Sequence, residues 1–497
     1  MTSISEVRAQ VYAEVQGLVA VVERASPQTA TEVEIALWAG MLRLGASMMG
    51  LFFAHQAARW PSGLRYKVSG VAYEIVGADV ADVGTKFGRV RVSQPIGRVV
   101  GQPRARRDMP MAQALGLPGG FTLPLVSLVA KFCALMAFLP TRQVLRDLLG
   151  WAPAPRSVLR MVDAVGAEAR GFLNQAAVPE GDTDVLLITV DGKGAPTISS
   201  AEDAKRRQPH RKGTAGLRQR KSGSPKKRRG PGKKSKNAKM AAVGVICTLK
   251  RDDSGRSRPV NKRMYATFKS YRELFVWLKA EAVRRGYGTN KFKQVQFVAD
   301  GADTLWTLQR EFFPDAKVCL DWVHAVEKLW DCGKAIHRGS RTKREPLEVW
   351  VHQQKKLLRH GGLNEVLSTL RTALAGTAPT GPGNKFRRTV LGDTINHFTK
   401  NRARMRYRTL RQQGLVISSG LIEGTVRHLV GMRLDGPGMR WGKARAEAVL
   451  QLRCVLLNGL WTDFESYLAR RRGSLRLASK PLPTVTHDAK KQLKRAA

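Results

Sequence analysis

Two aspartates each follow a predicted strand and precede a glycine. Asp191 comes after Val185–Val190, and Asp300 comes after Val295–Ala299. Continuous apolar runs of this length are typical of central strands that are buried on both faces. If these strands are neighbours in one sheet, both carboxylates emerge at the same edge, close enough to share a metal. Mg²⁺ prefers hard oxygen ligands, so the pair predicts metal-dependent phosphodiester chemistry.

A third carboxylate, Glu423, stands where Ser418–Glu423 opens a helix. Together with the two aspartates it could hold two Mg²⁺ ions, with Mn²⁺ as a substitute. One ion would activate water or a 3′-hydroxyl, and the other would stabilise the leaving oxygen. Arg427, one turn later, could touch phosphate. Each residue also has a structural interpretation, because Asp-Gly at a strand end is often only a turn and Glu423 alone would be a surface residue.

The charge of the chain points to a polyanionic partner. The 497 residues carry 85 Lys and Arg against 39 Asp and Glu, a formal charge of +46. Nucleic acid is the expected partner, and a membrane surface is the weaker alternative. Residues 205–239 contain sixteen basic residues and no acidic residue, and are expected to be disordered without a partner. This insert is predicted to bind DNA, with a solubilising loop as the alternative, and its predicted contacts are Lys226, Lys227, Arg228 and Arg229.

The elements that must position the aspartates follow the order three strands, helix, strand, helix, strand. The expected ranges are Val185–Val190, Ala241–Leu249, Arg263–Phe268, Ser270–Arg285, Val295–Ala299, Thr304–Phe313 and Lys317–Leu320. This is the order of an RNase H-like mixed sheet, in which an antiparallel meander joins a parallel half. The predicted class is therefore α/β, with an α-helical insertion in the core and a helical and β-rich N-terminal region before it.

A helix-turn-helix pattern precedes the core. Thr141 can cap a helix that runs to Leu149, a Gly-containing turn follows, and Pro155 suits the first turn of a helix over Arg156–Glu168. Motifs of this kind contact DNA at the start of their second helix. The predicted contacts there are Arg156, Ser157 and Arg160. An ordinary helical hairpin fits the pattern equally well, and the net charge favours DNA binding.

The N-terminal segments predict two helices over residues 3–59 and short strands within 63–107. Ile35–Ala58 is apolar enough to raise the question of a membrane span, but Arg43 within it makes insertion costly, so we expect a buried helix and no membrane partner. No signal peptide is expected, and the five scattered cysteines predict neither a disulfide framework nor a zinc site. These features suggest a soluble protein of the bacterial cytoplasm, associated with the nucleoid.

Further residues have a functional and a structural interpretation. His324 could orient a catalytic group or contact DNA, although a lone histidine among Trp322, Val323 and Trp330 is more often simply packed. Trp441 could stack on a base, but a core aromatic is slightly favoured. A run of arginines is predicted to form a phosphate-facing track, since like charges without acidic partners argue against a merely solvated face. Its members are Arg402, Arg404, Arg406, Arg408 and Arg411.

Several spaced motifs resemble the DDE transposases of bacterial insertion sequences, in particular the ISKra-type group, which is distantly Mutator-like. They are Val190–Gly194, Val298–Ala302, Asp321-Trp-Val-His324, Ser418–Gly424 and Gly438–Trp441, and the resemblance covers roughly residues 110–460. It implies that Asp191, Asp300 and Glu423 form the catalytic triad. It implies also a helical insertion domain between Asp321 and Glu423, and a homo-oligomer that acts on element ends and target DNA. One departure is that residues 60–115 lack the cysteine pairs that relatives often carry.

The expected organisation has seven parts. They are N-terminal helices over 1–60, a β-rich region over 61–120, the helix-turn-helix region over 121–180, the first part of the core over 181–322, the helical insertion over 323–415, the closing helices of the core over 416–472, and a basic tail over 473–497. The expected function is DNA cleavage and strand transfer. A structure-selective nuclease of the same fold and a non-catalytic DNA-binding protein derived from a transposase are the alternatives.

Overall fold

The computed structural model describes residues 3–24, 27–102, 104, 107–198, 238–337, 345–436 and 438–471. They belong to two compact units, a first unit of Met1–Phe172 with Gly459–Ala497 and a second unit of Leu173–Asn458. The predicted basic tail and nearly all of the insert at 205–239 lie outside the described residues. The predicted DNA contacts Lys226, Lys227, Arg228 and Arg229 lie outside them as well.

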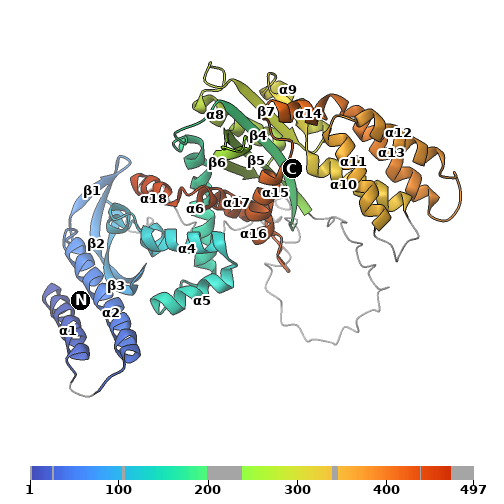
Figure 1. The fold of residues 1–497 in the computed structure, drawn as a ribbon. Helices are drawn as coiled ribbons and strands as arrows, with labels where there is room; N and C mark the ends of the chain where they lie inside the picture. The colour runs from blue at the N-terminus through green and yellow to red at the C-terminus, as the bar shows by residue number, and fades with distance from the viewer. Residues whose placement is uncertain are drawn as a thin grey trace, which may run out of the picture. The chain divides into compact units, whose positions relative to one another are not determined.

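The first unit begins with the two predicted helices, α1 (Ile4–Val22) and α2 (Ala30–Ala57) (Figure 1). Each starts with a capping box, in which a serine or threonine and the glutamate three residues later satisfy each other's backbone N–H groups. An antiparallel sheet of β1 (Arg65–Val68), β2 (Val71–Thr85) and β3 (Gly88–Val99) follows. Phe53 of α2 packs with Val83, Val90 and Val92 of this sheet to form a core.

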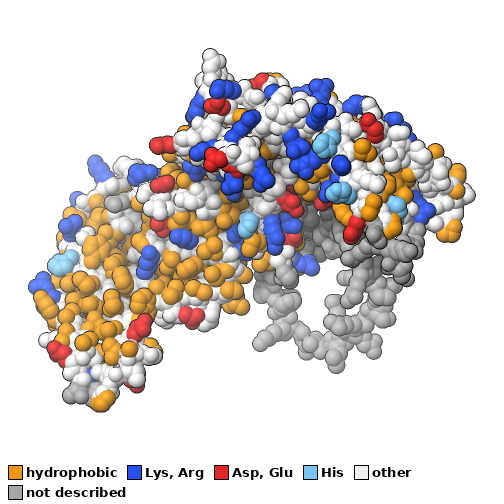
Figure 2. Space-filling view, in the orientation of Figure 1, with side chains coloured by type: hydrophobic (Ala, Val, Ile, Leu, Met, Phe, Trp, Pro, Cys, Tyr) orange, Lys and Arg blue, Asp and Glu red, His pale blue; other side chains and the backbone are white. Residues whose placement is uncertain are grey.

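Helix α2 is not the buried helix that its composition predicted. Only Gly40 and Phe53 are buried along it, and Ile35 is 67% and Trp38 52% exposed. Figure 2 shows hydrophobic side chains gathered over α1 and α2. Within the described residues, α2 is the one helix whose length and composition would allow it to cross a membrane. The prediction was wrong because apolar composition does not specify which surface covers a helix.

The remaining helices of the first unit include the predicted helix–turn–helix pair. They are α3 (Pro110–Ala114), η1 (Pro118–Gly120), α4 (Leu123–Leu135), α5 (Phe138–Leu149), α6 (Pro155–Gln175) and α18 (Trp461–Arg470). Helix α5 ends at Gly150, whose φ of 70° is left-handed and suits glycine. Helix α6 runs past the predicted end at Glu168, because its apolar stripe continues through the buried Ala169 and Phe172. A DNA-binding role for the pair stays a prediction.

The second unit contains a five-stranded mixed sheet. Its strands are β4 (Val185–Pro196), β5 (Ala238–Arg251), β6 (Ser257–Thr267), β7 (Gln294–Ala299) and β8 (Lys317–Leu320), in the spatial order β6-β5-β4-β7-β8. β4 pairs antiparallel with β5 and parallel with β7. The predicted chain order and the junction of an antiparallel meander with a parallel half are confirmed.

Strand β4 does not end at Asp191 as predicted. It continues to Pro196, because β5 goes on pairing with Gly192–Pro196 after the last β7 pair, Val190 with Ala299. Asp191 therefore stands where β4 loses its parallel neighbour but keeps its antiparallel one, which leaves one edge of the strand open.

Helices surround this sheet. Helix α8 (Tyr271–Arg285), capped by Ser270, packs on β5 and β6, and α9 (Asp303–Phe312) follows β7. The segment predicted to be mostly helical contains α10 (Trp322–Ile336), α11 (Glu345–Arg359), α12 (Leu363–Ala375), α13 (Asn384–Lys400), η2 (Arg402–Arg404) and α14 (Tyr407–Gln412). Figure 1 shows α10–α13 gathered into one bundle. Helices α15 (Gly420–Val426), α16 (Met432–Leu434) and α17 (Lys443–Leu457) complete the unit, with a π-helical turn, Arg427–Gly431, between α15 and α16.

Candidate active site

Asp191 and Asp300 emerge side by side from neighbouring parallel strands. Val190 pairs with Ala299, so the two aspartates are the next residues in the same register. In-register neighbours of a parallel pair point to the same face of the sheet. The backbone N–H of Gly192 donates to Asp191 Oδ1 at 2.6 Å, and that of Ala302 donates to Asp300 Oδ1 at 3.0 Å. The structure therefore brings together the pair that the sequence predicted.

A third aspartate, Asp321, follows the next parallel strand. Its backbone N–H donates to the Ala299 carbonyl at 2.9 Å, directly after β8, and its side chain is buried. Oδ2 of Asp321 lies 2.6 Å from Nδ1 of His324, and Oδ1 accepts from the Ser419 N–H at 2.7 Å. In the sequence, the motif Asp321-Trp-Val-His324 after the strand Lys317–Leu320 marks this residue. The sequence interpretation, however, considered a function for His324 alone.

Negative charge is concentrated at this edge. Burial raises the pKa of Asp191, and the charges of Asp300 and Asp321 raise it further, against the opposing effects of the Gly192 N–H and His324. The hydrogen bond to Asp321 raises the pKa of His324 to about 9, so its ring is a cation at neutral pH. Burial alone would raise the pKa of Asp321, but hydrogen bonds from His324 and Ser419 outweigh burial and lower it.

Tyr271, at the start of α8, also reaches the site and was missed by the sequence interpretation. A β-carbon on Gly192 would collide with the Tyr271 hydroxyl, so this glycine is needed for the close approach. Burial raises the pKa of Tyr271 to about 12, with further contributions from the charges of Asp191 and Asp300. No sequence motif marks this tyrosine, because its place comes from the packing of α8 on the sheet.

Glu423 lies on the helix that crosses the Asp191 face of β4. Side chains alternate along a strand, so Lys193 shares that face with Asp191. Lys193 Nζ lies 3.3 Å from Asp435 Oδ2, and a β-carbon on Gly431 would lie 3.4 Å from Lys193 Cε. Helix α15, which carries Glu423, itself packs against β4 and β5.

The Glu423 carboxylate is exposed on this helix, while Ile422 and Thr425 beside it are buried. Within the described ranges, no three His, Cys, Asp or Glu side chains are grouped closely enough to hold a metal. The structure thus joins Asp191 with Asp300 and places Glu423 on a neighbouring helix, but does not gather all three side chains.

A buried arginine holds the π-helical turn that follows Glu423. Arg453 of α17 donates from Nε to the Leu429 carbonyl at 2.8 Å and also donates to the His428 carbonyl. Burial lowers the pKa of this guanidinium to about 10. Such turns are frequent at functional sites, and this one begins at Arg427, the predicted phosphate contact, whose side chain is exposed.

The other predicted contacts fall into two groups. Trp441 is buried, and its Nε1 donates to the Leu434 carbonyl at 3.0 Å, which fits the interpretation as a core aromatic. Arg404 is half-buried, and its guanidinium lies 4.3 Å from the centre of the Trp306 ring. It therefore contributes more to packing than to the predicted phosphate-facing track. The exposed residues are Arg156, at the start of α6, and Arg402, Arg406, Arg408 and Arg411, while Ser157 and Arg160 are half-buried.

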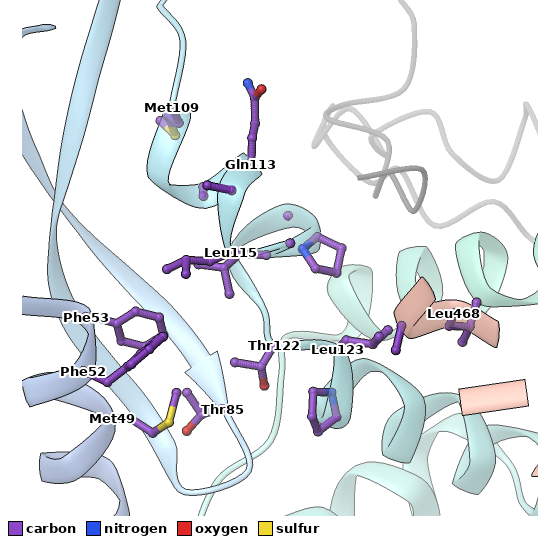
Figure 3. A pocket seen from close by; sticks show the side chains of 18 of the residues that line it. Met49, Phe52, Phe53, Thr85, Met109, Gln113, Leu115, Thr122, Leu123 and Leu468 are labelled. Carbon is purple, nitrogen blue, oxygen red and sulfur yellow. The ribbon is translucent and has the colours of Figure 1, made fainter. Parts of the chain in front are cut away.

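The first unit has a pocket of its own, of about 1450 Å³. Figure 3 shows Phe52 and Phe53 of α2, Leu115 beyond α3 and Leu123 of α4 around it. Its lining is mainly apolar and includes a single carboxylate, Asp108. The pocket therefore lacks paired acidic side chains, and the carboxylate edge of the second unit is the better candidate for chemistry.

No family model matches the chain, and no curated protein matches it. Among solved structures, the chain is similar to the Drosophila P element transposase strand transfer complex, with a TM-score of 0.28 and 9% identity over 67% of this chain and 92% of that chain. At so low a TM-score, this likeness assigns neither a family nor a function to the chain.

Proposed function

We propose that this chain is a DDE transposase, of the ISKra-type group, that cuts DNA and joins the cut ends to a target. The observation that carries the proposal is the placement of Asp191 and Asp300 in one register at the ends of adjacent parallel strands. The strand order β6-β5-β4-β7-β8 supports an RNase H-like core, since it combines an antiparallel half with a parallel half. The formal charge of +46 supports DNA as the partner.

The carboxylate oxygens of Asp191 and Asp300 are the kind of donor that a hard divalent cation prefers. Burial raises the pKa of Asp191, and the charges of Asp300 and Asp321 raise it further, so a bound cation would favour its ionised form. Asp191 and Asp300 would hold Mg²⁺ or Mn²⁺, and Glu423 would be the third ligand, on a helix that already lies on the Asp191 face. Bound ions of this kind activate water or a 3′-hydroxyl and stabilise the leaving oxygen.

Other side chains have roles that follow from their positions. Tyr271, with a pKa of about 12, keeps its proton at neutral pH, and its hydroxyl lies beside Gly192, on the face of β4 opposite the Asp191 side chain. The His324 cation, fixed by Asp321, adds positive charge where phosphate must approach. Exposed Arg402, Arg406 and Arg408 would bind the DNA backbone, and Arg156 on α6 would recognise element ends.

The test uses the full chain with Mg²⁺, a labelled duplex carrying the DNA that flanks its own gene, and a supercoiled target plasmid. The proposal expects cleaved ends and labelled target, both lost in Asp300→Asn. Asp253→Asn, which removes an exposed carboxylate of the same unit, is the control and should match the parent. Cleavage without joining would favour the structure-selective nuclease. DNA binding with neither product would favour the non-catalytic derivative. Full activity of Asp300→Asn would overturn the site.

A further inference from the structure

His397 of α13 reaches the turn that follows Asp300, although it comes from the helical segment outside the sheet. A β-carbon built on Gly301 would lie 2.7 Å from His397 Cε1 and 3.2 Å from Nε2. Gly301 has a φ of +96°, a left-handed conformation that favours glycine. The glycine after Asp300 therefore does more than permit a turn, because its missing side chain makes room for an imidazole.

The position of His397 is fixed by contacts between the end of α13 and α9, the helix that starts after this turn. Lys400 Nζ lies 2.6 Å from Asp303 Oδ2, and the Arg404 guanidinium stacks on Trp306 of α9. Asn401 is buried and donates from Nδ2 to the His397 carbonyl at 3.0 Å, and its Oδ1 accepts from Arg404 at 2.7 Å. These contacts anchor the last turn of α13 beside the Asp300–Gly301 turn.

The Nε2 atom of His397 is buried without a hydrogen-bond partner in the part of the chain that the structure describes. Burying a nitrogen without a hydrogen-bond partner lowers the stability of the fold by about 1–3 kcal/mol. A histidine at this position therefore needs a physical explanation. Phenylalanine would fill the same space without this cost. The Asp300 carboxylate directly precedes the glycine that His397 contacts, and its Oδ1 accepts from the Ala302 N–H.

We propose that His397 is a positioning residue for Asp300, and that its Nε2–H orients the Asp300 carboxylate when that carboxylate binds a divalent cation. Carboxylates that bind metals are themselves held by hydrogen bonds, and loss of such a partner lowers metal affinity by about 10- to 100-fold. The inference rests on the proposed function, because it takes Asp300 as a ligand. It gives the helical segment a direct part in the site, in addition to any contact with DNA.

The test measures Mg²⁺ and Mn²⁺ affinity of the DNA-free full chain by calorimetry, together with the melting temperature in EDTA. His397→Phe keeps a ring against Gly301 but removes the nitrogen. We expect its metal dissociation constant to rise by about 10- to 100-fold, while its melting temperature in EDTA equals or exceeds that of the parent. His397→Gln, whose amide nitrogen can stand in for Nε2, should recover part of the affinity. His352→Phe, on the exposed side of α11, should bind metal like the parent.

The outcomes separate this inference from the proposed function. If Asp300→Asn loses metal affinity but His397→Phe binds both ions as the parent does, the positioning role is wrong and the metal site stands. If Asp300→Asn itself binds both ions as the parent does, Asp300 is not a metal ligand and the proposed function is wrong, whatever His397→Phe does. If His397→Phe does not fold, His397→Asn decides, since its shorter side chain cannot reach the same point. Parent-like affinity in a folded His397→Asn would overturn the inference.

Discussion

Nδ1 of His324 lies 2.6 Å from Oδ2 of Asp321, and this pair joins the end of β8 to the first turn of α10. The Asp321 side chain is buried, and that of His324 is about one-third exposed. The same aspartate also accepts from the Ser419 N–H, at the entrance to the helix of Glu423. One carboxylate thus ties together β8, α10 and the segment that leads to α15.

This pair predicts a stability that depends on pH. The pKa of His324 in the folded protein, about 9, exceeds its ordinary value of 6.5. The contribution of the pair to the free energy of unfolding is therefore complete below pH 6.5 and is lost as the pH rises through about 9. The free energies of unfolding of the parent and of His324→Gln should be measured with urea in the presence of EDTA. The difference between them should be constant from pH 5 to 6.5 and should decline by pH 10. A difference that does not change between pH 7 and 10 would show that the pair carries no charge-assisted bond.

Asp191 is expected to destabilise the fold when no cation is bound. Its pKa is raised, by burial first and then by neighbouring charge, so its ionisation lowers stability as the pH rises above the ordinary value of 3.8. Asp191→Asn should therefore melt at a higher temperature than the parent in EDTA at pH 7. Saturating Mg²⁺ should stabilise the parent, by about 2.7 kcal/mol at one hundred times the dissociation constant, and should not stabilise the variant. A lower melting point for Asp191→Asn in EDTA would contradict this account.

The contact between Gly192 and Tyr271 can be tested by a double-mutant cycle. Gly192→Ala should lower the free energy of unfolding by about 1–3 kcal/mol, because its methyl group meets the Tyr271 hydroxyl and lies 3.2 Å from the Ala241 carbonyl. Tyr271→Phe removes the hydroxyl, so the double variant should recover part of the loss. Gly424→Ala is the control, since nothing lies within 4 Å of its added carbon, and it should stabilise α15 by about 1 kcal/mol. Strict additivity of Gly192→Ala and Tyr271→Phe would mean that the two side chains do not meet.

Much of the sheet could be predicted because its signals are local. The apolar run before Asp191 marks a central strand, Ser270 caps α8, and Gly150 ends α5, each by chemistry within a few residues. The neighbouring positions of Asp191 and Asp300 also followed, since the strand order fixes which strand ends are adjacent. What the apolar run could not show is that β4 continues to Pro196, because that depends on its partner β5.

The parts that could not be predicted depend on packing between distant segments. Tyr271 and His397 reach the site only because α8 and α13 dock beside two glycines, and neither residue stands in a motif. The exposure of α2 was missed for a similar reason, since composition gives the apolarity of a helix and not its neighbours. For Glu423, the sequence predicted the helix, and the structure adds the face of the sheet on which that helix lies.

Arg453 is predicted to hold in place the helix that carries Glu423, through the π-helical turn that begins at Arg427. Its guanidinium donates to the carbonyls of His428 and Leu429 inside the π-helical turn. Arg453→Met would fill most of the space but would leave the buried Leu429 carbonyl without this donor, which should lower the free energy of unfolding by about 1–3 kcal/mol. The turn should then relax towards regular α-helix, which rotates the residues before it relative to β4.

We expect a lower melting temperature and slower DNA cleavage, with faster amide hydrogen exchange confined to residues 423–434. Arg445→Met, at the half-buried start of the same helix, is the control and should keep parent-like exchange in that range. Unchanged exchange there in a less stable Arg453→Met would show that this arginine supports the core alone and leaves the Glu423 helix untouched.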